Sequence, residues 1–92
     1  MKNIKLLNSD YIIEKDDTNC FDLEVVENLF TDYFLVFDYV LGDYSYGKLR
    51  LKGFFANDNA KSSKINKYDG LEIYLKEYCA YNCDYFVIKK QK

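Results

Sequence analysis

The feature that most constrains the fold is a pair of adjoining segments in the middle of the chain. Residues 34–41 (FLVFDYVL) are apolar on both faces of a strand except at Asp38, and residues 48–55 (KLRLKGFF) alternate basic with apolar side chains. A strand that is apolar on both faces needs cover on both, whereas an alternating strand turns one face toward the core. With the glycine-bounded connection 42–47 between them, the two segments predict a β-hairpin with a long loop.

The register of this hairpin can be predicted from burial, because a shift of one residue moves every side chain to the other face. Placing Asp38 opposite Arg50 pairs the carboxylate with the only arginine, whereas the shifted register leaves Asp38 among leucines at a cost of several kcal/mol. We therefore expect a structural pair between Asp38 and Arg50. This register leaves Phe34, Val36 and Val40 opposite the helices, as a face for self-association, for a partner or for another segment of the chain.

Two helices are predicted by their first turns and by the spacing of their apolar residues. One begins after Asp22, an N-cap residue, and we expect its apolar stripe to face the core at Leu23, Val26, Leu29 and Phe30. The other has the capping-box spacing of Asp69 and Glu72, followed by apolar residues three and four positions apart.

The elements follow one another in the order βαββαβ, with the outer strands at residues 11–15 and 84–89. Residues 4–7 either extend the first strand or pair with it. This order predicts an α+β domain with about four mostly antiparallel strands and two helices on one face. A ferredoxin-like arrangement is the simplest fit, but it usually places the second strand at an edge, so the strand order stays open.

The composition favours a single domain, residues 1–92, and excludes several classes of enzyme. An apolar content of 49%, with ten tyrosines and seven phenylalanines, fills a small core without disulfides. The absence of histidine excludes a Ser-His-Asp triad, a Cys-His pair, a zinc-binding HExxH helix and a His-ligated haem within this chain. We assign no catalytic residue, metal ion or cofactor.

Cysteine usage and hydropathy predict a cytoplasmic protein without a membrane segment. The N-terminal residues lack the continuous apolar stretch of a signal peptide, and no run reaches the roughly 18 residues of a membrane-spanning helix. Three cysteines are an odd number, which favours reduced thiols. Cys79 and Cys83 are interpreted as small buried residues, because a structural zinc site needs four ligands.

Charge is divided unevenly between the two halves of the sequence. Residues 1–46 contain three lysines and ten acidic residues, a net charge of −7, and residues 47–92 contain ten basic and five acidic residues, a net charge of +5. Such an asymmetry could steer an encounter with a partner. We prefer the interpretation that the halves neutralise each other within one folded domain.

The connection 42–47 is the first candidate binding site. It brings an acidic residue and two phenols, Asp43, Tyr44 and Tyr46, close to Arg50, whose planar guanidinium suits a ligand or a partner's carboxylate. Alternatively, the two glycines occupy left-handed positions and the tyrosines pack over the end of the sheet.

The basic row Lys48, Arg50 and Lys52 is the second candidate. Basic residues interleaved with aromatic ones, here Tyr39 and Phe54, can contact phosphates and stack on RNA bases. The pI of about 5.0 argues against a nucleic-acid surface. The alternative is a solvated strand face.

Two blocks of the sequence resemble the YutD-like family of small proteins from low-GC Gram-positive bacteria. They are residues 38–55 (DYVLGDYSYGKLRLKGFF) and residues 77–87 (EYCAYNCDYFV). The chain departs from the family pattern at Tyr44, Ser45 and Lys48. The resemblance implies a cytosolic α+β domain with no established activity, and it therefore supplies no catalytic residue.

Taken together, these features favour a small cytosolic binding module that contacts a protein partner or a second copy of itself. An RNA- or ribosome-associated accessory protein using the basic row is the alternative. A small-ligand-binding protein or enzyme using the 42–47 connection comes third.

Overall fold

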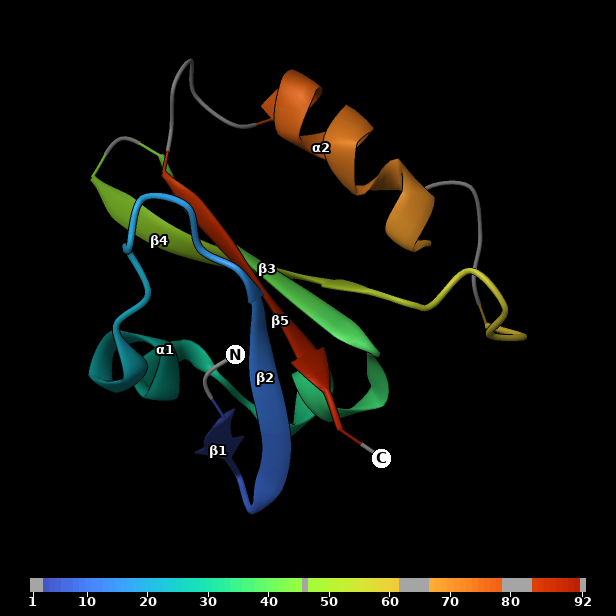
Figure 1. Ribbon diagram of the computed structural model, residues 1–92, viewed down its shortest axis with the longest axis horizontal. Helices are drawn as coiled ribbons and strands as arrows, with labels where there is room; N and C mark the ends of the chain where they lie inside the picture. Colours follow the sequence, from blue (N-terminus) through green and yellow to red (C-terminus); the bar gives the residue numbers. More distant parts are fainter. Residues whose placement is uncertain (1–2, 46, 62–66, 79–83, 92) are drawn as a thin grey trace.

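A five-stranded antiparallel sheet with one α-helix on each side forms the fold (Figure 1). The computed structural model describes residues 3–45, 47–61, 67–78 and 84–91. The strands are β1 (Asn3–Leu6), β2 (Ser9–Lys15), β3 (Tyr39–Ser45), β4 (Lys48–Phe54) and β5 (Tyr85–Lys90). Their order in the sheet is β1-β2-β5-β3-β4. The predicted α+β class is confirmed, and residues 3–6 pair with β2 as a strand of their own.

The helical elements are α1 (Leu23–Leu29), the 3₁₀ helices η1 (Asp32–Val36) and η2 (Tyr68–Gly70), and α2 (Leu71–Tyr78). Asp22 is the N-cap of α1, as predicted, and its carboxylate accepts hydrogen bonds from the backbone N–H groups of Glu24 and Val25. Among the described residues, no helix is long and apolar enough to cross a membrane.

The prediction that both helices lie on one face is wrong. Val26 and Phe30 pack with Val40, Phe86 and Ile88, whereas Leu71 of α2 packs with the residues that alternate with these, Leu41 and Val87. Because neighbouring strand residues point to opposite faces, α1 and α2 cover opposite faces of the sheet. The physical reason is that β3 and β5 are both interior and apolar on both faces, so each face requires cover.

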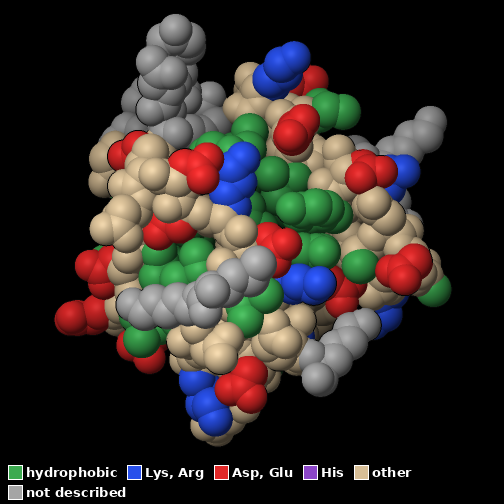
Figure 2. All heavy atoms as spheres, viewed as in Figure 1, with side chains coloured by type: hydrophobic (Ala, Val, Ile, Leu, Met, Phe, Trp, Pro, Cys, Tyr) green, Lys and Arg blue, Asp and Glu red, His purple; other side chains and the backbone are tan. Residues whose placement is uncertain are grey.

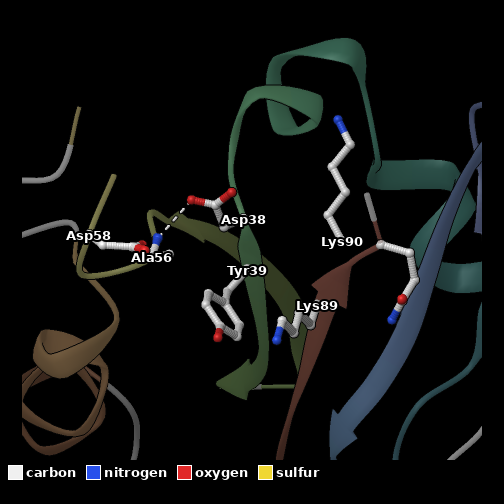
Figure 3. Close-up of a pocket in the computed structure, with 7 residues that line it drawn as sticks. Asp38, Tyr39, Ala56, Asp58, Lys89 and Lys90 are labelled. Atoms are coloured by element: carbon white, nitrogen blue, oxygen red, sulfur yellow. Dashed lines mark hydrogen bonds between the residues drawn. The ribbon is translucent and has the colours of Figure 1, made fainter. Parts of the chain in front are cut away.

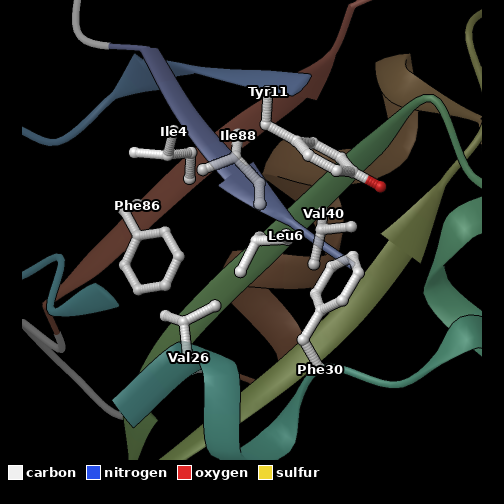
Figure 4. Packing of buried hydrophobic residues seen from close by; sticks show 8 residues of the cluster. All are labelled: Ile4, Leu6, Tyr11, Val26, Phe30, Val40, Phe86 and Ile88. Carbon is white, nitrogen blue, oxygen red and sulfur yellow. The ribbon is translucent and has the colours of Figure 1, made fainter. Parts of the chain in front are cut away.

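The ferredoxin-like arrangement is also excluded, because β3 lies inside the sheet between β5 and β4. Side chains of β5 alternate between the two faces: Phe86 and Ile88 belong to the α1-side core shown in Figure 4, and Val87 belongs to the α2-side core.

The predicted hairpin forms, but its register is wrong. Asp43, not Asp38, lies opposite Arg50, and Ser45 lies opposite Lys48. Because Ser45 and Lys48 are paired, the connection is shorter than the six residues predicted, and Gly47 has a positive φ of +77°, a backbone conformation that favours glycine. Gly42 lies within β3.

The Asp38 carboxylate forms hydrogen bonds with groups that lie outside the β3–β4 strand pair. It accepts hydrogen bonds from the backbone N–H of Ala56 at 2.7 Å and from the Asn59 amide at 2.9 Å. Both donors lie in the segment after β4. Burial of Asp38 therefore requires no arginine opposite it.

The expected apolar face of Phe34, Val36 and Val40 does not exist as one surface. Phe34 and Val36 belong to η1 rather than to the sheet, and β3 begins only at Tyr39. Val40 is fully buried in the α1-side core. Phe34 packs against that core, and Val36 is exposed.

Candidate functional site

The most buried charge of the predicted site is Asp43, which forms an ion pair with Arg50. The Asp43 side chain is fully buried and its Oδ2 lies 2.6 Å from Arg50 Nη2, while the Arg50 side chain remains 43% exposed. Neighbouring strands position the two residues directly opposite each other. The pair is built into the sheet on the α2 side and holds β3 and β4 in register.

The other residues predicted for the 42–47 site are not gathered in a loop. Tyr44 follows Asp43 on β3, points to the opposite face and packs against the α1-side core. Burial raises the pKa of the Tyr44 hydroxyl. Tyr46 lies outside the described residues. Asp43 and Arg50 do not line the pockets of about 440, 160, 400 and 110 Å³ that described residues form.

The basic row lies along β4, an edge strand, and its members Lys48, Arg50 and Lys52 share the α2 side of the sheet. Lys52 Nζ lies 5.9 Å from the centre of the Phe54 ring. Phe54 is fully buried, so its ring is not open to a nucleic-acid base.

The second aromatic residue of the predicted RNA surface is also covered. The Tyr39 ring stacks on Tyr68 with centroids 4.1 Å apart, and burial raises the pKa of both hydroxyls. Lys89 Nζ lies 5.8 Å from the Tyr39 ring. The rings beside the basic residues are therefore used for internal packing and for cation–π contacts.

A pocket of about 440 Å³ opens where β3, β5 and the segment after β4 meet (Figure 3). It is lined by Asp38, Tyr39, Ala56, Asp58, Lys89, Lys90 and Gln91. Asp38 bonds Ala56 across it, and Lys90 Nζ donates to the Leu35 carbonyl at 2.6 Å. These contacts join η1 and the segment after β4 to the sheet, which gives Asp38 and Lys90 structural roles.

The surface that sequence reasoning missed is the outer side of α1 and η1, here called the α1–η1 face. Its exposed apolar residues are Leu23, Val25, Leu29, Tyr33 and Val36, and its acidic residues are Glu24, Glu27 and Asp32. Of the stripe predicted to face the core, only Val26 and Phe30 are buried, because a helix of seven residues turns few side chains toward the sheet.

The charges of the two halves are not fully neutralised by the fold. Asp43–Arg50 joins the halves, but none of the described basic side chains forms an ion pair with Glu24, Glu27 or Asp32. Figure 2 shows acidic side chains, interspersed with apolar ones, gathered at the lower left, where Figure 1 places α1. The signal in the sequence was the absence of any lysine or arginine from residue 16 to residue 47.

Comparisons with known proteins agree with one another. A family described as "Putative antitoxin YutD-like" matches residues 5–89. The protein named "Putative antitoxin YutD" from Bacillus subtilis (strain 168) is 36% identical over 87 residues, which are 95% of this chain and 96% of that protein. The solution NMR structure of protein yutD from B. subtilis superposes with a TM-score of 0.83 at 34% identity, covering 100% of this chain and 84% of that one.

Proposed function

Because the chain belongs to the YutD-like family, we propose that it acts as an antitoxin, a protein that binds a protein toxin and blocks its activity. The observation that carries this proposal is the match along residues 5–89 to a family described by that function. The sequence also predicted a binding module that works through protein contacts in the cytoplasm, and we propose the same compartment here.

Neutralisation by binding requires a surface rather than a reaction centre. A stable protein complex buries about 800 Å² on each partner. The accessible surface of this chain is 6161 Å², so one face of the domain is large enough. Exposed apolar side chains on the α1–η1 face support contact with a protein.

The test is neutralisation of an identified partner. A tagged chain is purified from its source bacterium, and each protein that copurifies in stoichiometric amount is expressed alone in a second host. We expect one of these proteins to arrest growth, and co-expression of this chain to restore it. If every copurifying protein is harmless alone, or if the growth arrest persists with excess chain, the proposal is wrong.

RNA binding through Lys48, Arg50 and Lys52 stays a prediction. The aromatic rings that favoured it are packed internally, so the basic row alone supports it. Binding to a single-stranded RNA oligonucleotide that weakens steeply with salt, and that is lost in the Lys48→Glu, Lys52→Glu variant, would support this alternative.

A further inference from the structure

We propose that the α1–η1 face is the docking surface for the toxin, and that the toxin meets it with an apolar patch bordered by lysine or arginine. This inference rests on the proposed function and specifies which part of the chain carries it. It concerns a surface separate from the basic row and from the 42–47 segment.

The first argument is that the apolar residues of this face do not serve the core. Val26 and Phe30 already fill the side of α1 that faces the sheet. Tyr33 is nevertheless 65% exposed, Val36 54% and Leu29 42%. Apolar side chains gathered within so short a segment mark contact surfaces on small proteins.

The second argument is that these side chains are ordered in pairs. Val25 and Leu29 are four residues apart on α1, which places them side by side on one flank of the helix. Tyr33 and Val36 are three residues apart in η1, where such positions eclipse each other. Each pair presents a continuous apolar contact.

The third argument is that Tyr33, the most exposed apolar side chain of this face, is held in place before any partner binds. The Tyr33 ring packs against Phe34 and Phe37, with centroids 5.1 and 5.3 Å apart, and Phe34 lies 5.4 Å from Phe30 in the core. Side chains that are already ordered lose little conformational entropy on binding, so more of the contact energy becomes affinity.

The fourth argument is charge. Glu24 and Glu27 are exposed on α1 and Asp32 is exposed on η1, and neither element contains a lysine or arginine. Lys90 reaches η1 from β5 and donates a hydrogen bond to the Leu35 carbonyl. A basic partner would be steered toward this face and an acidic one repelled. The complementary surface is therefore cationic at its border and apolar at its centre.

A second copy of this chain fits the face less well. The basic row of a second copy and its Lys89 lie on the α2 side of the sheet. Contact between the acidic face of one copy and these basic residues of the next would be head-to-tail, and such contacts either close into a ring or continue into open chains. A single basic toxin forms a complex without such repeated contacts.

The experiment compares matched variants on the two helices, using the toxin that wild-type chain neutralises. Glu24→Lys with Glu27→Lys reverses two exposed charges on α1, and Glu72→Lys with Glu77→Lys makes the same net change on α2. Leu29→Gln with Val36→Ser removes exposed apolar groups, and Ile73→Ser, at a position 60% exposed on α2, is its control. Thermal unfolding verifies that each variant folds.

We expect each α1–η1 variant to weaken toxin binding at least tenfold and each α2 variant to change it less than threefold. The charge reversal should also flatten the dependence of affinity on salt.

If the α2 variants lose binding while the α1–η1 variants keep it, the docking face is wrong and the antitoxin function stands. If wild-type chain neutralises no protein, the function fails and the inference fails with it. A dimer of the chain alone that Leu29→Gln with Val36→Ser dissociates would assign the face to self-association and overturn the inference.

Discussion

The two faces of the sheet differ in what their apolar residues do. On the α2 side, the tyrosines and Phe54 pack against one another, and lysines lie over their rings, as Lys52 does over Phe54 and Lys89 over Tyr39. On the α1 side, the core is complete with Val26 and Phe30, yet several apolar residues remain exposed on α1 and η1, against Ile73 alone on the described part of α2. Folding explains the first arrangement and leaves the second unexplained. An apolar surface beyond the needs of the core indicates a binding partner.

The charges of the two faces differ in the same way. Basic side chains along an edge strand discourage pairing with the edge of another chain, and Lys48, Arg50 and Lys52 lie on such a strand. The basic row therefore has a structural role without any ligand. Glu24 and Asp32 lie in the first turns of α1 and η1, where a carboxylate is favoured by the helix dipole. Neither they nor Glu27 form an ion pair with a described basic side chain.

The largest effect is expected for a substitution at Gly42, on the α1 side of the sheet. A Cβ atom at this position would lie 2.1 Å from Cζ of Phe86, which is fully buried and packs edge-to-face on Phe21 at 4.9 Å. The ring is fully buried and must move to accommodate the added Cβ atom, so Gly42→Ala should lower the free energy of unfolding by about 3 kcal/mol. Chemical denaturation followed by circular dichroism measures the change.

Gly47→Ala is the control for that substitution. Nothing lies within 4 Å of its added Cβ, but its φ of +77° is strained for alanine, so we expect a loss of about 1 kcal/mol. Equal losses at the two glycines would contradict close packing of Phe86 on β3.

The next largest effect is expected from removing the Asp43–Arg50 ion pair on the α2 side of the sheet. Arg50→Met leaves the buried Asp43 carboxylate without its guanidinium partner, and this should cost about 3 kcal/mol, the lower end of the range because the arginine is partly exposed. Adding Asp43→Asn should recover part of the loss, since the amide carries no charge. A double-mutant cycle from urea unfolding measures the coupling, and a value near zero would show that the pair does not stabilise the sheet.

The sequence predicted those elements whose determinants are local. The N-cap at Asp22 depends on hydrogen bonds to residues two and three positions later. The shared side of Lys48, Arg50 and Lys52 depends on the alternation along β4 alone. The register failed because Asp38 bonds residues 18 and 21 positions away, which strand pairing alone does not reveal. The α1–η1 face was missed because spacing identifies apolar positions but not how short a helix is or which of them the sheet covers.

The smallest effect is expected for a substitution at Tyr11. Its ring is fully buried on the α1 side, and its centroid lies 5.5 Å from that of Phe30. Burial raises the pKa of its hydroxyl from 10.0 to about 12, and among the described residues the buried oxygen has no hydrogen-bond partner. Between these two pH values the unfolded chain loses the proton while the folded chain keeps it, so stability is complete below pH 10 and falls above it, by up to about 3 kcal/mol. Tyr11→Phe should reduce this alkaline loss, leaving the part that comes from the other buried tyrosines, and should raise the free energy of unfolding at neutral pH by about 1 kcal/mol.

Tyr33→Phe, at a position 65% exposed, should do neither. Urea unfolding at pH 7 and at pH 11 separates these outcomes, and an unchanged alkaline loss in Tyr11→Phe would mean that water reaches the α1-side core.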